Sequence, residues 1–136
     1  MMKIVVTDGY AENPGDLSWE PLRAFGELTV YDRVAPDDEE EMLRRIGDAD
    51  IAVTNKGVVS KKVIDACPNL KLVSILATGY NIVDLAAAKR RGITVCNVPG
   101  YSTRAVVQMT FALLLEICQQ VGLHSGAVHT GRWQTC

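Results

Sequence analysis

The sequence predicts an α/β protein with a flavodoxin-like, doubly wound parallel sheet of five strands, followed by a long apolar helix. Two observations carry this prediction. Five short apolar runs alternate with four helical patterns over residues 1–98, and right-handed crossovers limit such an alternation to a few topologies. After Pro99 the pattern changes to a single long helix that is apolar on every side.

The expected strands are short and rich in β-branched or other large apolar residues. Residues 70–76 are interpreted as one continuous apolar run, as expected of a strand that is covered on both faces. The five strands are expected at residues 3–7, 27–31, 50–54, 70–76 and 93–96.

Capping residues and helix breakers delimit four helices between these strands. Such residues satisfy the free backbone groups at helix ends or prevent the helix from continuing. The first helix is expected at 17–25, with Asp16 or Ser18 as its cap and Pro21 in its first turn. The second begins at Asp37 and is stopped by Gly47. The third is capped by Ser60 and ends before Pro68, and the fourth is expected at 83–91, ended by Gly92.

A longer helix is expected from Ser102 or Thr103, one of which caps it, to about Val121. Its apolar residues point in nearly every direction, so all of its sides need cover. A complete five-stranded domain can cover only one side, and the helix therefore requires another domain or a partner subunit. These residues are Ala105, Val106, Val107, Met109, Phe111, Ala112, Leu113, Leu114, Leu115, Ile117, Cys118 and Val121.

Composition narrows the class of protein further. A net charge of −2 and the lack of a Lys/Arg run argue against nucleic-acid binding. The longest apolar run, 111–115, is too short for a membrane span, and no signal peptide opens the chain, so a cytoplasmic location is expected. The four cysteines lack C-x-x-C spacing and are expected to be reduced and mostly buried; no metal site is expected, even at His124 and His129.

Three segments of the sequence resemble the D-isomer-specific 2-hydroxyacid dehydrogenase family, and the resemblance covers essentially the whole chain. The tetrapeptide Thr54-Asn55-Lys56-Gly57 is similar to the variant found in glycerate dehydrogenases, also called hydroxypyruvate reductases. The other two segments are Ala77-Thr78-Gly79-Tyr80-Asn81-Ile82-Val83-Asp84 with Ala-Ala-Lys-Arg-Arg-Gly at 87–92, and Asn97-Val98-Pro99-Gly100-Tyr101-Ser102-Thr103 with the apolar helix after it and Gly131-Arg132-Trp133.

The resemblance implies a two-lobed oxidoreductase that reduces a small 2-keto acid, such as hydroxypyruvate or glyoxylate, with NAD or NADP as cofactor. Residues 1–98 would form the substrate-binding domain. Residues 99–136 would begin a nucleotide-binding domain, and two copies of the chain would form a homodimer through its helix at 103–121. The family places substrate contacts at Lys56, Leu76, Ala77, Thr78 and Gly79, and cofactor contacts at Thr78 and Val106.

Other family features do not occur in these 136 residues. There is no G-x-G-x-x-G motif, which holds the dinucleotide pyrophosphate, and no residue matches the catalytic Arg, Glu or His. Ile82 stands where Asn is common, and Val107-Gln108-Met109 replaces Ala-Gln/Glu-His. No catalytic residue is therefore assigned, and the chain by itself is expected to be inactive.

Two alternatives to an enzyme portion follow from the same residues. The apolar helix also fits a non-catalytic dimerising module that complements a separate C-terminal half. A flavodoxin-like signalling receiver needs an acidic cluster, a phosphorylatable Asp and a Lys at strand ends. Asp8, Asn55 and Asn97 stand near those places, which argues against a receiver.

Overall fold

The computed structural model describes residues 1–135, except for the side chain of Trp133. The chain forms two compact units, Met1–Pro99 and Gly100–Cys136. The first unit contains the sheet, and the second consists of helices. The resemblance at Trp133 and the expectation for Cys136 lie outside the described side chains.

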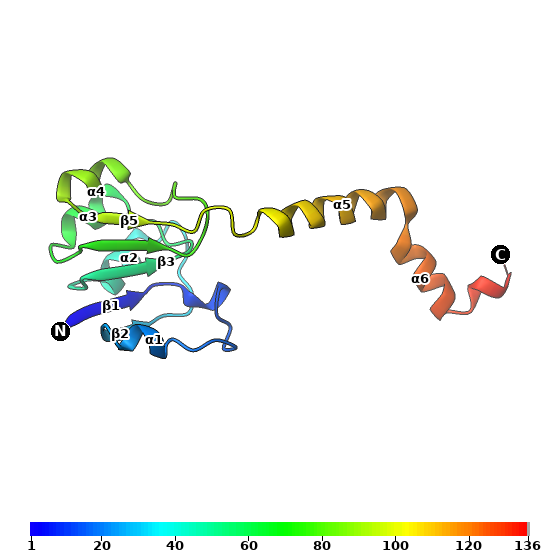
Figure 1. Cartoon of the computed structure of the whole chain (residues 1–136), viewed down its shortest axis with the longest axis horizontal. Coiled ribbons are helices and arrows are strands. Elements are labelled where there is room, and N and C mark those ends of the chain that lie inside the picture. The colour runs from blue at the N-terminus through cyan, green and yellow to red at the C-terminus, as the bar shows by residue number, and fades with distance from the viewer. Residues whose placement is uncertain (136) are drawn as a thin grey trace. The chain divides into compact units, whose positions relative to one another are not determined.

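The first unit is built on a five-stranded sheet in which every neighbouring pair is parallel. The strand order β2-β1-β3-β4-β5 is that of flavodoxin-like folds, so the predicted topology is confirmed (Figure 1). The strands are β1 (Met2–Val6), β2 (Gly26–Val30), β3 (Ile51–Thr54), β4 (Leu72–Ile75) and β5 (Thr94–Cys96).

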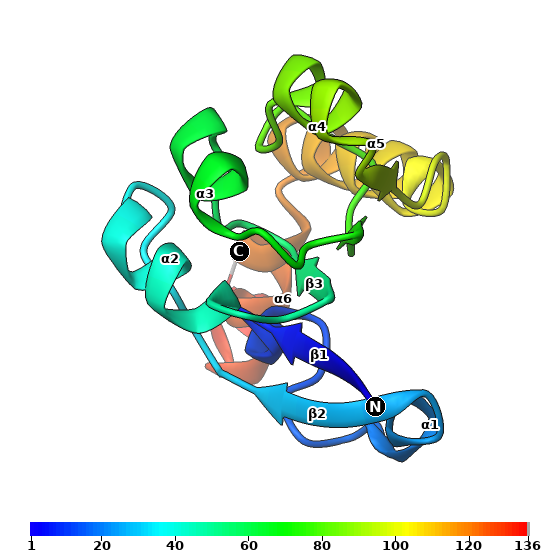
Figure 2. The same ribbon diagram turned by 90° about the vertical axis from the view of Figure 1, so that its left-hand side faces the viewer.

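Three helices cover one face of the sheet and form the larger core (Figure 2). They are α2 (Glu39–Ile46), α3 (Lys61–Ala66) and α4 (Leu85–Arg91). Because side chains alternate along a strand, one set of strand residues meets these helices. The core joins Val5, Ala52, Val73 and Ile75 of the strands to Met42, Ile46, Val63, Ile64, Ala87 and Ala88 of the helices.

Within the first unit the opposite face has less cover, which comes from the short helix α1 (Glu20–Arg23) and the residues just before it. Trp19 and Leu22 pack there on a small cluster of Ile4, Val6, Leu28 and Val53. This cover does not reach the far strands, where Leu72 and Ser74 of β4 are half-buried. The expectation that residues 70–76 are buried on both faces is therefore wrong.

The first helix is shorter than the expected 17–25, and neither predicted cap stands at its N-cap position, although Ser18 Oγ accepts from the Glu20 N–H at 3.1 Å. Asn13 explains this difference. Its side-chain oxygen accepts hydrogen bonds from the backbone N–H groups of Gly15 (3.1 Å) and Leu17 (3.0 Å), which holds the segment in a turn that competes with the helix. Trp19 occupies the N-cap position in place of Asp16 or Ser18, and Pro21 lies in the first turn as expected.

The other helix ends of this unit follow the local sequence signals closely. Ser60 caps α3 by accepting from the Val63 N–H, and Gly92 ends α4 in the left-handed conformation (φ 68°), as predicted. Gly47 ends α2 with a positive φ. The α2 cap is Asp38, one residue later than expected; it accepts from the Glu41 N–H at 3.0 Å.

The second unit contains two helices instead of the one that was expected. Helix α5 (Thr103–Gln119) ends at Gln120, whose left-handed φ of 49° bends the chain by 62° into α6 (Val121–His129). Ser102 occupies the N-cap position of α5, but its side chain makes no capping hydrogen bond, so that part of the prediction is wrong. Short 3₁₀ turns lie at Gly9–Ala11 and Arg132–Thr135.

The apolar side chains of α5 are largely exposed, and Ile117 is the most open of them at 76%. Cys67 is buried, whereas Cys96 and Cys118 are exposed, which corrects the expectation for these two thiols. Within residues 1–135, no single helix is long and apolar enough to cross a membrane; the bent pair α5–α6 meets that test jointly, by length and composition alone.

Candidate functional site

The loops that follow the parallel strands gather at one edge of the sheet, which is where open α/β sheets bind ligands. Asp8 follows β1, Lys56 follows β3, and Leu76–Gly79 follow β4. Since β1 pairs with β3 and β3 pairs with β4, these three loops are neighbours. The structure thus places Lys56 and the predicted substrate residues of the β4 loop after two neighbouring strands, while Lys56 and Leu76 line different cavities.

A buried carboxylate holds the turn that carries Lys56. Asp8 Oδ1 accepts from the Asn55 N–H at 2.9 Å, and Asp8 Oδ2 accepts from the N–H groups of Lys56 (2.5 Å) and Gly57 (3.1 Å). The Thr7 hydroxyl donates to the same carboxylate at 2.9 Å. Hydrogen bonds to an ionised acceptor are the strong ones, so this turn is firmly anchored.

Packing at Gly57 adds a second restraint on the same turn. A Cβ atom at this position would clash with the thioether of Met42 in helix α2, so a larger residue requires the Met42 side chain to move. The Thr54 hydroxyl donates to the Gly57 carbonyl at 3.1 Å. Lys56 is exposed although its neighbours Asn55 and Gly57 are buried, so the turn presents this one side chain to the outside.

The loop after β4 is tied to the strand on each side of it. Leu76 N–H donates to the Thr54 carbonyl at 2.9 Å, and Val98 N–H donates to the Ala77 carbonyl at 3.0 Å. Thr78 Oγ1 donates to the Val98 carbonyl at 3.1 Å, and Asn97 Nδ2 donates to the Thr78 carbonyl at 2.8 Å. The loop is thereby fixed with Thr78 at its exposed tip.

The backbone donors at the tip of this loop are free. Among the hydrogen bonds of residues 1–135, none uses the N–H group of Thr78 or Gly79. Adjacent free N–H groups suit an anion such as a carboxylate. Gly79 has an ordinary negative φ, and a Cβ there would meet only Asn81 Oδ1 at 3.3 Å.

Two small cavities open beside these loops. One, of about 180 Å³, is lined by Lys56 and Asp8 together with Ala11, Asp32, Arg33 and Val34. The other, of about 210 Å³, is lined by Leu76 together with Glu12, Asn13, Leu17, Ser18 and Trp19. Both adjoin a predicted substrate residue, Lys56 in the first and Leu76 in the second.

Glu12 is an unusual group in the second cavity. Its Oε2 atom is buried without a hydrogen-bond partner among the described residues. Burial, and then the nearby negative charge of Asp8, raise the pKa of the Glu12 carboxyl above its usual range, while Lys56 opposes this effect. The cavity therefore contains an oxygen that is not hydrogen-bonded by the protein.

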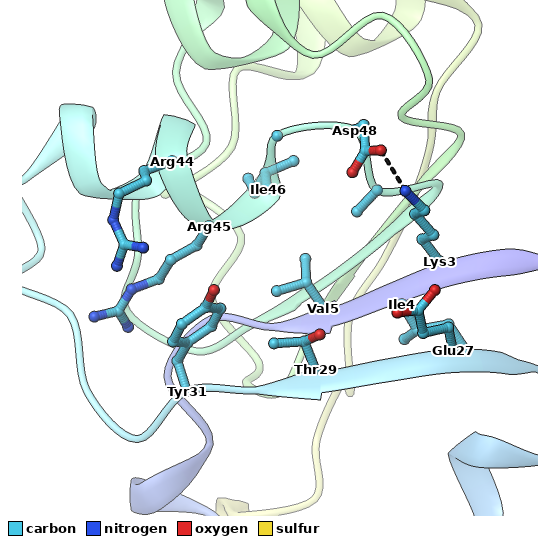
Figure 3. A pocket seen from close by; sticks show the side chains of 12 residues that line it. Lys3, Ile4, Val5, Glu27, Thr29, Tyr31, Arg44, Arg45, Ile46 and Asp48 are labelled. Atoms are coloured by element: carbon cyan, nitrogen blue, oxygen red, sulfur yellow. Dashed lines mark hydrogen bonds and ion pairs between the residues drawn. The ribbon is translucent and has the colours of Figure 1, made fainter.

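A third cavity, of about 230 Å³, lies along strands β1 and β2 beside the end of α2 (Figure 3). Several of its charged groups form ion pairs: Lys3 with Asp48, and both Arg44 and Arg45 with Glu41. Figure 3 shows Arg45 beside Tyr31, and its guanidinium lies 4.7 Å from the ring centroid.

The predicted cofactor residues belong to different units. Thr78 lies in the first unit, and Val106 lies on α5 in the second unit, where it is exposed. Within residues 1–135, no group of three or more His, Cys, Asp or Glu side chains could hold a metal ion. His129 Nδ1 lies 2.8 Å from the carbonyl of Ser125, one turn earlier in α6.

Sequence reasoning missed the roles of Asp8, Asn97 and Glu12 at this edge of the sheet. The sequence predicts no structural role for Asp8, and for Asn97 only a place in the family segment 97–103, although an acidic or amide side chain directly after a strand is a visible signal. The burial of Glu12 is not visible in the sequence, because its neighbours Asn13, Leu17, Ser18 and Trp19 meet the remote Leu76 only in the fold.

Comparisons with known proteins agree with this architecture. Residues 4–135 match the family described as D-isomer specific 2-hydroxyacid dehydrogenase, catalytic domain. The hydroxypyruvate reductase of Blautia hydrogenotrophica is 54% identical over 134 residues, which are 98% of this chain and 42% of that protein. The glyoxylate reductase of Thermococcus litoralis is 34% identical over 97% of this chain and 39% of its own length.

Solved structures give the same result. The 2-hydroxyacid dehydrogenase of Ketogulonicigenium vulgare superposes with a TM-score of 0.74 at 29% identity, covering 99% of this chain and 42% of that one. An acyclic imino acid reductase in complex with NADPH and D-Arg superposes with a TM-score of 0.76 at 28% identity, covering 96% and 41%.

The chain spans about two fifths of the length of these relatives. Its five-stranded parallel sheet and the family match over residues 4–135 lead to one conclusion. The chain belongs to the D-isomer-specific 2-hydroxyacid dehydrogenase family of oxidoreductases, and it matches the family's catalytic domain.

Proposed function

We propose that this chain supplies the substrate-binding portion of an NAD(P)-dependent oxidoreductase that reduces a small 2-keto acid, such as hydroxypyruvate or glyoxylate. The observation that carries the proposal is the position of Lys56 and of the free N–H groups of Thr78 and Gly79 in the loops that follow two neighbouring strands. The 54% identity to a hydroxypyruvate reductase supports the same substrate class.

The chemistry of a 2-keto acid matches this arrangement. Its carboxylate is an anion with two acceptor oxygens, which the N–H groups of Thr78 and Gly79 bind as a pair. Lys56 adds a positive charge from the neighbouring strand end, and Leu76 and Ala77 provide the apolar wall beside the substrate carbon atoms. Held in this way, the substrate is oriented with its keto group in a fixed direction.

In this proposal residues 1–98 are the substrate-binding domain, and residues 99–136 begin the nucleotide-binding domain. Thr78 and Val106 lie beside the dinucleotide, which supplies hydride when bound. The solved imino acid reductase, which carries NADPH, supports this cofactor class. No G-x-G-x-x-G motif occurs in these 136 residues, so they do not hold the pyrophosphate, and this polypeptide alone does not oxidise NADH or NADPH.

A second candidate is a non-catalytic dimerising module, and the exposure of helix α5 favours it. Leu113, Leu114 and Ile117 are each more than half exposed. Apolar surface of this kind marks interaction sites, and burying each large side chain stabilises an interface by about 1.5–3 kcal/mol. Both candidates include a homodimer through α5, so they differ in ligand binding and not in assembly.

The test is a titration of the purified 136-residue chain with hydroxypyruvate and with glyoxylate, followed by backbone amide resonances. We expect the amides of Thr78 and Gly79 to shift with saturation, and Lys56→Ala to weaken binding by about tenfold, as expected for a charged hydrogen bond. Arg33→Ala is the matched control, since it removes a cation from the cavity beside Lys56.

Separate assays of NADH and NADPH oxidation complete this test. No turnover is expected from the chain alone. Ligand binding without turnover supports a substrate-binding portion. A chain that dimerises and shifts no loop resonance with either acid supports the dimerising module instead. Turnover that scales with this chain would contradict the account given for the cofactor site.

A further inference from the structure

The carboxylate beneath the Lys56 turn is almost completely buried, with 6% of Asp8 exposed. Three consecutive backbone N–H groups point at it, from Asn55, Lys56 and Gly57. Burying a charge is costly unless hydrogen bonds compensate it, so Asp8 and the turn depend on each other. If the turn moved, it would leave a desolvated charge without its donors.

We propose that Asp8 is the positioning residue of the substrate site: its carboxylate holds the 55–57 turn in the conformation that presents Lys56 to the substrate carboxylate. This inference rests on the proposed function, in which Lys56 contacts the 2-keto acid. Both Asp8 oxygens are occupied by the turn and by Thr7. Asp8 therefore acts through Lys56 and does not itself bind the substrate.

The surroundings of Asp8 make the anchor rigid. Arg45 of helix α2 donates to the Thr7 carbonyl at 2.5 Å, which ties the strand end that carries Asp8 to that helix. Met42 of the same helix packs on Gly57 at the far end of the turn. A lysine side chain loses rotamer freedom when it binds a ligand. A fixed backbone limits the positions open to its amine before binding, so less conformational freedom is lost.

Asp32 provides a control that separates position from charge. It lines the same cavity as Asp8 and Lys56 and has the same carboxylate, but it accepts none of the turn's hydrogen bonds. Asp8→Asn and Asp32→Asn therefore remove equal charge near Lys56. Only Asp8→Asn replaces an acceptor oxygen with an amide that faces backbone donors.

The experiment compares the wild-type chain with these two variants by nuclear magnetic resonance. It measures hydrogen exchange of the amides of Asn55, Lys56 and Gly57, the side-chain carbon resonances of Lys56, and the amides of Thr78 and Gly79, each with and without hydroxypyruvate. Exchange at Val73, in the middle of the sheet, reports whether the fold is intact.

For Asp8→Asn we expect exchange in the turn to rise by about tenfold or more, with Val73 unchanged. Affinity for hydroxypyruvate should fall by about tenfold, and the Lys56 side chain should no longer respond to the ligand, whereas Thr78 and Gly79 still shift. Asp32→Asn should retain the wild-type turn exchange and the Lys56 response. General damage to the fold would remove all of these signals together.

Equal losses in both variants would show that charge alone matters, and a Lys56 response retained in Asp8→Asn would show that the turn is not needed; either overturns the proposal. If the Asp8→Asn variant loses exchange protection at Val73, the Thr54→Val variant is used in its place. Thr54→Val removes the hydrogen bond from the hydroxyl to the Gly57 carbonyl and keeps Asp8. There a rise in turn exchange of about threefold with an equal fall in affinity is expected, and faster exchange at unchanged affinity contradicts the inference.

The wild-type result separates this proposal from the proposed function. If hydroxypyruvate shifts neither Lys56 nor Thr78 and Gly79 in the wild-type chain, the proposed function fails and the role of Asp8 fails with it. If the ligand shifts all three in the wild type and the Lys56 response survives in Asp8→Asn, only the role of Asp8 fails.

Discussion

The two units of the chain differ in how far their apolar residues are buried. In Met1–Pro99, Ile64 and Ile75 are completely buried between the sheet and its helices. In Gly100–Cys136, helix α5 is also rich in apolar residues, yet its Ile117 is 76% exposed. The difference shows that apolar content alone does not make a core. Burial requires a second surface, which the sheet receives from α2, α3 and α4.

Helix ends follow the same division. Helices α2, α3 and α4 each begin with a side chain that accepts a hydrogen bond from the first turn: Asp38, Ser60 and Asp84. Helices α1 and α5 have no side chain that caps them from the N-cap position, and in α6 the first-turn Gly122 N–H donates to Glu116 of α5. Helices α2, α3 and α4 therefore have local start signals as well as packing, whereas α5 depends on whatever covers its apolar surface.

The largest effect should come from cavity formation in the core. Ile75→Ala deletes buried atoms from the larger core, so we expect the free energy of unfolding of the first unit to fall by about 2–5 kcal/mol. Ile117→Ala on α5 should change it by less than about 0.5 kcal/mol. Chemical denaturation followed by far-UV circular dichroism measures both.

Self-association should depend on Ile117 and not on Ile75, which is the reverse of the effects expected on unfolding. If α5 forms a homodimer, Ile117→Lys should weaken the dimer by about tenfold or more in sedimentation equilibrium, and Ile75→Ala should not. A wild-type chain that stays monomeric at high concentration would contradict the assignment of α5 as an interface. A large loss of first-unit stability in Ile117→Ala would remove the contrast between the units.

An intermediate effect is expected at the helix starts. Asp84 accepts from the Ala87 N–H at 2.8 Å, so Asp84→Ala should lower the free energy of unfolding by about 1 kcal/mol. Ser102→Ala removes no capping hydrogen bond and should be neutral within about 0.5 kcal/mol. The two variants are compared by thermal unfolding, and equal losses would show that Ser102 does cap α5.

The smallest effect concerns the acid stability of the first unit. Hydrogen bonds from Arg44 and then Arg45 lower the pKa of Glu41 from 4.5 to about 2. A carboxyl with a lowered folded-state pKa stabilises the protein above its unfolded pKa and loses that contribution as the pH falls. Glu41→Gln should therefore flatten the pH dependence of stability between 4.5 and about 2.

Thermal midpoints measured across that pH window test the role of Glu41. The effect is kept small by solvent, because the Arg44 side chain is 62% exposed. Lys61→Met is a suitable control, since it removes an exposed ion pair with Asp65 on α3. An acid profile of Glu41→Gln identical to that of the wild type would show that the ion pairs do not affect stability in solution.

Much of the fold was predictable because its signals are local. The five strands, the caps at Ser60 and Asp84, and the stops at Gly47 and Gly92 depend on residues within a turn or two. The order of the parallel strands then followed from the right-handedness of the crossover connections between them. The shortening of α1 by Asn13 and the bend at Gln120 were missed, because each is a competition between local conformations that a helical pattern does not reveal.

The candidate site was only partly predictable. Lys56 and the loop at 76–79 were found through resemblance, and the structure places them after two neighbouring strands. Their roles stay predictions until the titration is done. The anchor beneath Lys56 was not found, because nothing in the tripeptide Asn55-Lys56-Gly57 indicates which carboxylate will accept its three N–H groups.

The sequence by itself determined the α/β class, the strand order expected from it, and the family. Periodicity, capping and turn residues act over a few positions, and a sequence displays them directly. The tertiary structure alone decided which face of the sheet has less cover within the first unit, that Met42 packs on Gly57, and that Asp8 accepts from the turn that carries Lys56. The Asp8–Asn55 hydrogen bond joins residues 47 positions apart, and such pairs exist only after the strands have aligned.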